Sequence, residues 1–288
     1  MDRKKFLKSS ILGAAALAAG SKVAKAEKST YDKLMHQVGF NHLPNKEIRT
    51  MKTVLHKANT RGAADHGWLN SHHSFSFANY YNPERMHFGV LRVLNDDVVA
   101  SGRGFGTHPH DNMEIISIPL EGDLEHKDSM GNVTVIKQGD VQAMSAGTGV
   151  YHSEYNKNKD QEVKFLQIWL FPNQKNVIPR YDQITLDNAS QKNQLYQVLS
   201  PNADDEGVWI HQNAWFHMGN FDTGKETTYQ LKDKTNGVYA FVLEGDVTIE
   251  GQALNKRDGF GVWDTDAIHI KADKDARILL MEVPMTVN

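Results

Sequence analysis

From about residue 51 to the C-terminus the chain is built from short runs in which apolar and polar residues alternate. In the run from Glu114 to Leu120, for example, Ile116 and Ile118 share the face of Glu114. Successive side chains of a strand point to opposite faces, so a period of two predicts β-strands. Glycine and asparagine divide the runs at short intervals, which is typical of an all-β sandwich or barrel.

Polar clusters between the runs predict turns. Met86 to Leu94 is predicted to be a strand, and the Asn95-Asp96-Asp97 that follows it predicts a turn, because Asn and Asp hydrogen-bond their own backbone in tight turns. Ser129-Met-Gly-Asn132 predicts a further turn for the same reason.

The four residues Leu120-Glu-Gly-Asp123 recur as Leu243-Glu-Gly-Asp246. Each copy is followed by a β-like run, a glycine-containing turn and a further strand, which is the weak self-similarity expected of a duplicated barrel. The polar stretch from Asp187 to Gln197 separates the copies. We therefore predict an N-terminal domain over residues 51–190 and a C-terminal domain over residues 191–288.

Two short motifs carry the candidate chemistry: His108-Pro-His110 and His152-Ser-Glu154. Residues two apart on a strand point to the same face, so two paired strands can present three imidazoles and a carboxylate to one point. This donor set suits a divalent transition metal, and coordination positions left to water or substrate indicate a catalytic site. An isolated His-x-His is usually two solvated histidines; the joint occurrence of both motifs favours a metal site.

The second copy lacks these ligands. At the offsets before Leu243 that correspond to the two histidines before Leu120, the chain has Leu231 and Asp233. His269, in the same copy, has no visible partner and is interpreted as a structural or surface residue. We therefore predict a single metal site, in the N-terminal domain.

The two motifs resemble the two cupin motifs. Longer sequence runs that include them resemble the pirin family, particularly its bacterial members. The resemblance covers the chain from about residue 51 to its end. The runs that carry it are His66-Gly-Trp-Leu-Asn-Ser-His-His-Ser-Phe-Ser-Phe-Ala-Asn-Tyr-Tyr81, Gly104-Phe-Gly-Thr-His-Pro-His110, Leu120-Glu-Gly-Asp123, Asp128-Ser-Met-Gly-Asn132 and Met144-Ser-Ala-Gly-Thr-Gly-Val-Tyr-His-Ser-Glu-Tyr-Asn156.

The resemblance implies a bicupin, in which two face-to-face β-barrels of the jelly-roll type follow an N-terminal signal segment. It places the metal ligands at His108, His110, His152 and Glu154. Glu114 stands at the position of the cupin glutamate that pirins generally leave off the metal. The donor set admits Fe(II), Mn, Ni, Co or Cu, and the resemblance favours iron as Fe(II).

Bacterial pirins are known for quercetin 2,3-dioxygenase activity, so the resemblance implies a quercetinase. Such an enzyme opens the heterocycle of quercetin, or of a similar flavonol or enolic aromatic, with O2 and releases carbon monoxide. Glu154 or Glu114 is the predicted catalytic base, because a carboxylate near the substrate hydroxyl meets the geometric requirement. The residues that could form the entrance for an aromatic substrate are Trp68, His72, His73, Phe75 and Phe105.

Two alternatives stay open. Pirins also serve as protein-binding regulators, so the first alternative is a metal-containing binding or regulatory protein without turnover. The second is a metal-stabilised barrel with no substrate. Loss of a ligand should unfold the protein in the second alternative, whereas in an enzyme it should abolish turnover with the fold intact.

The first 26 residues have the three parts of a targeting signal. Arg3 to Lys8 is basic, Ile11 to Gly20 is apolar but too short to span a bilayer, and Ala24-Lys-Ala26 is an A-x-A cleavage site. The basic part resembles the twin-arginine export signal with Lys4 in place of the second arginine; a general secretory signal or a lipid-free membrane anchor is the alternative. We predict an exported, periplasmic protein, tethered to the membrane if the signal is uncleaved.

Charge and composition narrow the partners. Of the 32 Lys and Arg and the 35 Asp and Glu, 26 and 34 follow residue 26, which is a formal charge of −8 for the mature chain. This balance argues against nucleic acid. The absence of cysteine excludes disulfides, thiolate metal sites and cysteine nucleophiles. We expect a monomer that meets a small aromatic substrate and O2, with residues 27–50 as a polar tether and no membrane contact after the signal is removed.

Overall fold

The computed structural model describes residues 50–186 and 191–287. In these ranges the regular structure is β-strand apart from one 3-10 turn, η1 (Ala58–Thr60), which confirms the all-β prediction. No helix in the described ranges is long and apolar enough to cross a membrane. The predicted signal segment and almost all of the predicted tether lie outside the described residues.

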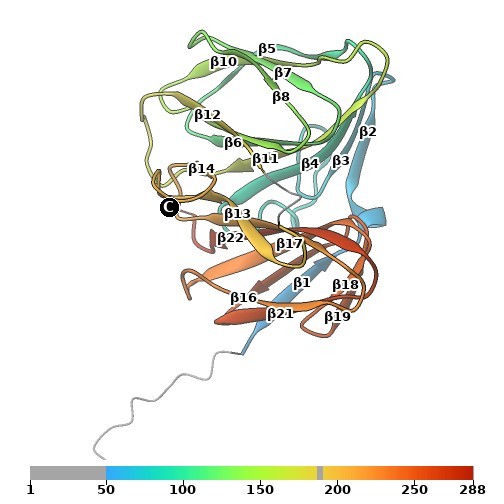
Figure 1. Ribbon diagram of the computed structural model, residues 1–288. Coiled ribbons are helices and arrows are strands. Elements are labelled where there is room, and N and C mark those ends of the chain that lie inside the picture. Colours follow the sequence, from blue (N-terminus) through green and yellow to red (C-terminus); the bar gives the residue numbers. More distant parts are fainter. Residues whose placement is uncertain (1–49, 187–190, 288) are drawn as a thin grey trace, which may run out of the picture. The chain divides into compact units, whose positions relative to one another are not determined.

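The described strands form four sheets, two in each half of the chain (Figure 1). The N-terminal sandwich, as we name it, has a seven-stranded sheet of order β12-β9-β6-β11-β4-β3-β2 and a four-stranded sheet of order β5-β10-β7-β8. Its strands are β2 (Gly62–Asp65), β3 (Leu69–His73), β4 (Leu91–Val99), β5 (Gly104–His110), β6 (Glu114–Glu121), β7 (Leu124–Asp128), β8 (Val133–Ile136), β9 (Asp140–Ser145), β10 (Val150–Asn156), β11 (Val163–Leu170) and β12 (Arg180–Thr185).

The C-terminal sandwich repeats this plan, with a seven-stranded sheet of order β1-β20-β17-β22-β15-β13-β14 and a four-stranded sheet of order β16-β21-β18-β19. Its strands are β1 (Lys52–His56), β13 (Leu195–Ser200), β14 (Val208–Trp209), β15 (Trp215–Phe221), β16 (Glu226–Gln230), β17 (Asn236–Glu244), β18 (Asp246–Ile249), β19 (Gln252–Asn255), β20 (Gly259–Trp263), β21 (Ala267–Ala272) and β22 (Ala276–Pro284).

The edge strands of the two large sheets come from different parts of the chain. In the N-terminal sandwich the edge next to β9 is β12, which follows the other strands in sequence. In the C-terminal sandwich the corresponding edge is β1, which pairs antiparallel with β20 although about 200 residues separate them. The first described strand therefore belongs to the sheet of the C-terminal sandwich. The domain limits drawn at residues 190 and 191 stay a prediction.

Strand β17 shows why the large sheets are apolar on both faces. Val238 and Val242 point into the cluster that fills the C-terminal sandwich, whereas Tyr239 and Phe241 point into a second cluster. That second cluster also contains residues of β4, β6 and β11, so it is a core shared by the two seven-stranded sheets. Alternate residues of such a strand point into different cores, so residues of both faces are apolar and the sequence of the strand is a continuous apolar run.

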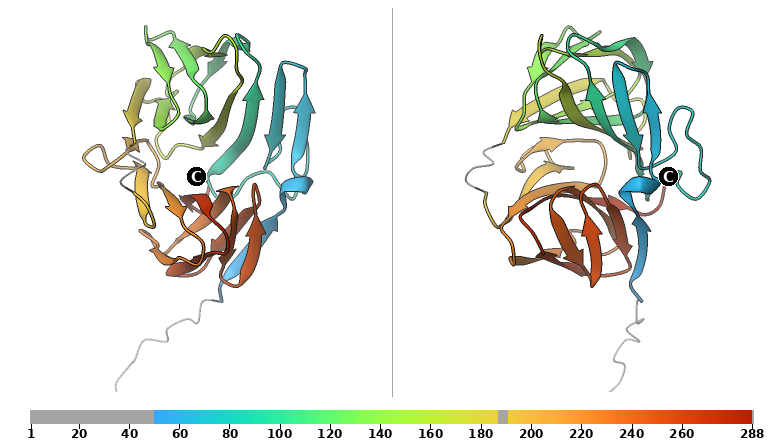
Figure 2. Two further views of the ribbon diagram at one scale, coloured as in Figure 1. Left: turned by 45° about the vertical axis from the view of Figure 1, so that its right-hand side comes forward. Right: turned by 90° about the vertical axis from the view of Figure 1, so that its right-hand side faces the viewer.

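The sheets of each sandwich are not joined by strand pairing among the described residues. Figure 2 shows them from two further directions. Each half is thus an open pair of sheets, held together by side chains, and the predicted β-barrels are not closed by hydrogen bonds. The predicted all-β architecture of two similar halves is confirmed.

The prediction of a turn at Asn95-Asp96-Asp97 is wrong, because β4 runs through all three residues and pairs with β3 and β11. Asn95 and Asp97 are buried on the inner face of the N-terminal sandwich. Asp96, on the other face, lies 3.2 Å from Arg61 and 2.9 Å from Arg257. The two neighbouring strands supply the backbone hydrogen bonds, so the turn preference of these residues is overridden.

Candidate metal centre

Strands β5 and β10 place the two motifs opposite each other. They pair antiparallel, with His152 across from His108 and Val150 across from His110. His108 and His110 lie two residues apart on β5, so both rings point to one face. The register shifts between His152 and Glu154, an irregularity of the kind that re-aims side chains beside functional sites.

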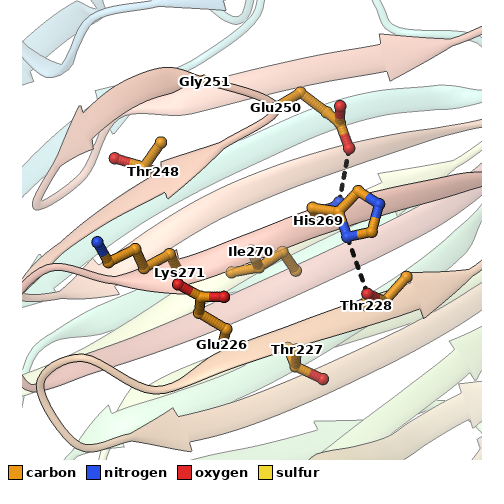
Figure 3. A pocket seen from close by; sticks show the side chains of 9 residues that line it. All are labelled: Glu226, Thr227, Thr228, Thr248, Glu250, Gly251, His269, Ile270 and Lys271. Carbon is orange, nitrogen blue, oxygen red and sulfur yellow. Dashed lines mark hydrogen bonds between the residues drawn. The ribbon is translucent and has the colours of Figure 1, made fainter.

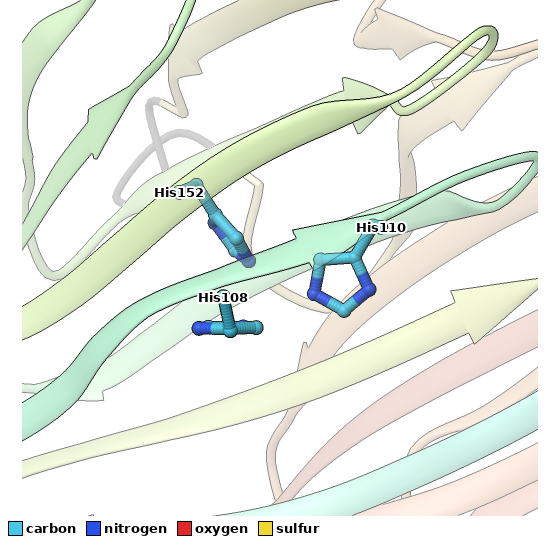
Figure 4. Close-up of side chains that lie close together, drawn as sticks. All are labelled: His108, His110 and His152. Atoms are coloured by element: carbon cyan, nitrogen blue, oxygen red, sulfur yellow. The ribbon is translucent and has the colours of Figure 1, made fainter.

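The three imidazole rings form a compact triangle (Figure 4). The ring centroids are 4.9 Å apart for His108 and His110, 4.4 Å for His108 and His152, and 4.9 Å for His110 and His152. Each ring offers one nitrogen within 4.8 Å of the nitrogens of the other two. We call these three residues the histidine triangle. Three ring nitrogens at this separation can converge on one divalent transition metal ion.

The hydrogen bonds of these rings leave nitrogen lone pairs free. Nδ1 of His108 lies 2.8 Å from the carbonyl oxygen of Gly106 and donates to it, so Nε2 keeps its lone pair. Nε2 of His110 and both ring nitrogens of His152 are buried without a partner among the described residues. Burial and the neighbouring histidines lower the pKa of His110 to about 4 and that of His152 to about 3, so both rings are neutral at neutral pH. Buried nitrogens without partners are unfavourable unless something binds them, so these residues fit a metal ion.

Glu154 lies beside the triangle and is held by two hydrogen bonds. Oε1 accepts from Ser117 Oγ at 3.0 Å, and Oε2 accepts from Gln167 Nε2 at 2.7 Å. One carboxylate oxygen forms, with ring nitrogens of His126 and His152, a second group of atoms within 4.8 Å of one another. The structure therefore brings the fourth predicted ligand next to the histidines, and its role as a ligand stays a prediction.

The sequence motifs did not single out His126, which lies on β7 across from Glu154. Its Nε2 lies 3.0 Å from Oδ2 of Asp128, and its Nδ1 is buried without a partner in the described part of the chain. Its ring centroid is 5.4 Å from that of His152. Asp128 thus holds the His126 ring through Nε2, and His126 packs beside His152. The sequence signal that could have identified His126 is its position two residues from both Leu124 and Asp128, which places the three side chains on the same face of a strand.

Glu114, the other predicted base, is buried away from this cluster. Its Oε2 accepts a hydrogen bond from Ser145 Oγ at 2.7 Å. Burial raises its pKa to about 7, although Ser145, the backbone of His211 and the charge of Arg180 act in the other direction. Glu114 does not line the cavity beside the histidines, so the structure does not bring it to the place where a substrate would bind. Its role as a base stays a prediction.

A cavity of about 300 Å³ lies beside the triangle. The four-stranded sheet contributes His108, His110 and Glu154 to its lining, and the seven-stranded sheet contributes residues of β3, β4 and β11. The Trp169 ring stands edge-on to the His110 ring at 4.8 Å and to the Phe77 ring at 5.4 Å. Apolar and aromatic walls with a few polar groups are typical of a small-molecule site.

The five residues proposed for the entrance have different places. His73 and Phe105 line the cavity, and Trp68 packs edge-on against Phe105 with ring centroids 5.5 Å apart. Phe75 is buried in the core shared by the two large sheets, and His72 is not among the lining residues. Two of the five residues therefore line the cavity, Trp68 contacts one of these two, and the role of the residues toward a substrate stays a prediction.

A second hollow, of about 410 Å³, lies on the C-terminal sandwich (Figure 3). His269 Nδ1 lies 2.9 Å from the Thr228 hydroxyl, and its backbone N–H donates to Glu250 at 2.6 Å. His269 is exposed, as predicted for a surface residue. None of the buried, unpartnered side-chain atoms in the described ranges belongs to its lining. The N-terminal cavity is therefore the candidate functional site.

Several known proteins resemble the chain over most of its length. Residues 54–170 match the family Pirin, and residues 197–283 match the quercetinase C-terminal cupin domain. Quercetin 2,3-dioxygenase of Escherichia coli strain K12 is 46% identical over 230 residues, which cover 80% of this chain and 98% of that protein. A pirin-like protein of Caulobacter vibrioides is 38% identical over 222 residues, which cover 77% and 95%. The crystal structure of the bacterial pirin YhhW of Escherichia coli in complex with nickel(II) is 43% identical, with a TM-score of 0.77 and coverage of 82% of this chain and 100% of that chain.

Proposed function

The chain belongs to the pirin family of cupin proteins, and from that premise we propose that it is a metal-dependent quercetin 2,3-dioxygenase. In this reaction O2 opens the heterocycle of quercetin, or of a similar flavonol or enolic aromatic, and carbon monoxide is released. The observation that carries the proposal is the histidine triangle at the wall of a cavity of about 300 Å³. Relatives named for this activity support the substrate class.

The residues that would hold the metal are His108, His110, His152 and Glu154. When bound, a divalent metal would supply Lewis acidity toward the substrate hydroxyl and a place for O2 to react. We propose Fe(II) first, with Mn, Ni, Co and Cu as the alternatives, because imidazole and carboxylate ligands suit all of them. The nickel(II) in the related pirin supports a divalent first-row metal without choosing among them.

The protein's own groups would position the substrate. Ser117 and Gln167 fix both oxygens of Glu154, so this carboxylate is oriented before a ligand enters. Trp169 and Phe77 give the cavity flat apolar walls on which the rings of a flavonol can lie. Glu154 and Gln167 are buried, so the electrostatic contacts that they make are stronger than they would be in water.

Oxygen uptake and carbon monoxide release with quercetin test the proposal. Mature protein is loaded separately with Fe(II), Mn, Ni, Co and Cu, and metal content is measured before each assay. We expect turnover with at least one metal, and loss of turnover in His152→Ala with an unchanged circular dichroism spectrum.

Two results would contradict the proposal. Protein shown to contain metal that neither consumes O2 nor releases carbon monoxide would favour a binding or regulatory role. Unfolding of His152→Ala together with absence of turnover in the parent protein would favour a metal that only stabilises the fold.

We further propose that the protein is exported to the periplasm, on the basis of the signal-like residues 1–26, and, as a separate expectation, that it is a monomer. These residues lie outside the described ranges, so the support is from sequence alone. Cell fractionation of the full chain, and of a variant with Arg3 and Lys4 replaced by Gln, tests export: the variant should stay in the cytoplasm. Gel filtration with light scattering tests the monomer.

A further inference from the structure

A set of polar residues lines the cavity wall formed by the seven-stranded sheet. Ser71 and His73 lie on β3, and Asn95 and Asp97 lie on β4. All four are less than 4% exposed and line the cavity that also contains two histidines of the triangle. Because β3 and β4 pair with Ser71 across from Asp97 and His73 across from Asn95, the four side chains form one patch. Polar groups this deeply buried are retained where they have partners or a function.

Three of these residues form a hydrogen-bonded chain. The Ser71 hydroxyl donates to Oδ1 of Asp97. Its oxygen lies 2.8 Å from Nε2 of His73, and since its own hydrogen points to Asp97, it accepts from His73 Nε2–H. Ser71 is the single hydrogen-bond partner of Asp97 side-chain atoms in the described ranges. Oδ2 of Asp97 is thus available to a ligand in the cavity.

Two further polar groups beside the cavity have no partner among the described residues. They are the side-chain oxygen of Asn95 and the indole Nε1–H of Trp169, both buried. Both residues line the cavity. A buried polar group without a partner costs about 1–3 kcal/mol, so a ligand with hydroxyl or carbonyl oxygens at these places would be favoured.

Glu154 and Asp97 differ as candidate bases. Both oxygens of Glu154 already accept hydrogen bonds from protein groups, Ser117 and Gln167. Asp97 accepts one hydrogen bond. Burial raises the pKa of Asp97 to about 7, with the Glu154 charge adding to the effect, and a base is most effective when its pKa lies near the working pH.

We propose that Asp97 is the catalytic base that takes the hydroxyl proton of the bound flavonol, that Ser71 and His73 position it, and that Asn95 binds a second oxygen of the same ligand. This assignment rests on the proposed function. In the step, the substrate O–H bond breaks and its electron pair stays on the substrate oxygen. The proton forms a new O–H bond at Oδ2 of Asp97, while Ser71 keeps donating to Oδ1. This step is a proton transfer, and neither the flavonol nor Asp97 is oxidised or reduced.

Charged and titratable groups stand next to Asp97 on β4 and around the same cavity. Asp96, the next residue, faces the opposite side of β4 and is paired with Arg61 and Arg257. On β11 the neighbour across from Asp97 is the apolar Phe165. The other titratable groups that line the same cavity are His66 between β2 and β3, His73 on β3, His108 and His110 on β5, and Glu154 on β10.

The test compares Asp97→Asn with the parent protein, both loaded with the metal that supports turnover. Metal content and circular dichroism establish that the site and the fold are retained. Under anaerobic conditions quercetin is added at about pH 8, where Asp97 is ionised and which is below the ordinary range for a phenol, and its absorption spectrum reports whether the bound flavonol is ionised. We expect the ionised spectrum with the parent protein and the neutral spectrum with Asp97→Asn. In aerobic assays we expect kcat/KM to fall about 100-fold or more.

Two further variants separate the roles. Ser71→Ala leaves the carboxyl in place and should give a smaller loss in kcat, with part of the bound flavonol neutral. Asn95→Ala should raise KM with kcat nearly unchanged, because it removes a binding contact. Asp65→Asn is the matched control: it removes an exposed carboxylate of β2 near the cavity and should leave both the spectrum and kcat/KM unchanged.

The outcomes distinguish the two proposals. If the parent protein turns quercetin over and both Asp97→Asn and Ser71→Ala bind it in ionised form with unchanged kcat/KM, Asp97 is not the base and the dioxygenase stands. If the parent protein binds and ionises quercetin, Asp97→Asn does not, and no carbon monoxide appears, the base assignment stands and the dioxygenase fails. Should Asp97→Asn not fold, Ser71→Ala alone decides, and its having no effect on the spectrum or on kcat overturns the assignment.

Discussion

The two sandwiches share one arrangement of strands and differ in what fills the space between their sheets. In the C-terminal sandwich, β21 contributes Ile268 and Ile270 to one continuous apolar cluster that spans both sheets. In the N-terminal sandwich the strand at the same position, β10, contributes His152 and Glu154. The apolar residues there form two separate, smaller clusters with the cavity beside them. One scaffold therefore holds either a packed core or a polar site, and a few inward positions make the difference.

The polar interior of the N-terminal sandwich carries a larger energetic cost than the interior of the C-terminal sandwich. Several histidine nitrogens in the N-terminal sandwich are buried without partners, which disfavours folding unless they are bound. The core shared by the two large sheets offsets this cost, because it buries the other face of β4, β6 and β11 whatever lies in the cavity. The C-terminal sandwich can thus act as the support on which a less stable, functional half is built.

The largest effect should come from removing the central histidine of the polar interior. His152→Ala should abolish stoichiometric metal binding, since it removes one of three converging nitrogens. Metal analysis after dialysis measures this. His269→Ala, on the corresponding strand of the C-terminal sandwich, is the control and should keep full metal content. Equal metal loss in both variants would show that the metal is not bound specifically by the histidines of the N-terminal sandwich.

The next effect concerns the packed interior. Ile268 is fully buried in the apolar cluster, so Ile268→Ala should lower the free energy of unfolding by about 2–5 kcal/mol through lost burial and a cavity. Urea denaturation followed by circular dichroism measures it. Ile268→Val, which removes one methylene, should cost about 0.5–1.5 kcal/mol. A loss below that of the Val variant would show that the C-terminal sandwich does not supply stability in this way.

A smaller effect, on metal affinity, should follow from replacing His126, whose ring packs beside His152. His126→Phe fills similar space but removes the nitrogens that bond Asp128 and face His152, so metal affinity should fall about 10–100-fold. Competition with a chelator measures it. Tyr181→Phe, which keeps the ring packed 4.7 Å from His126, is the control and should bind metal normally. Unchanged affinity in His126→Phe would remove His126 from the site.

The smallest effect is a pH dependence in the C-terminal sandwich. Burial, with a contribution from Lys232, lowers the pKa of His217 to about 4, whereas the unfolded chain has its ordinary value of 6.5. Below about pH 6.5 the unfolded state therefore binds a proton that the folded state does not, so stability should fall as the pH falls toward 4. The loss is at most about 3 kcal/mol.

His217→Phe tests this contribution, because it keeps an aromatic ring against Tyr229, whose ring centroid lies 4.9 Å away. The variant should show a flatter decline of unfolding free energy between about pH 6.5 and pH 4. An identical decline in the two proteins, measured in parallel urea titrations, would show that His217 has no part in it.

Much of the fold and part of the site could be predicted from the sequence. The period of two predicted the strands, and the parity of His108, His110 and His152 predicted the triangle. The turn at Asn95-Asp96-Asp97 was predicted wrongly because polarity was taken as exposure. In a strand that lines a functional cavity, polar residues face inward, so polarity and exposure no longer coincide.

Local features could be read from the amino-acid sequence: strand periodicity, the two histidine motifs, the duplicated Leu-Glu-Gly-Asp sequence and the family. Which strand faces meet became visible only in the folded protein. Asp97 on β4, Gln167 on β11 and His126 on β7 reach the same region because sheet order brings their strands around one interior. The edge position of β1 was decided in the same way. The physical reason is that side-chain parity depends on neighbours along the chain, whereas strand pairing depends on contacts between distant segments that no local pattern specifies.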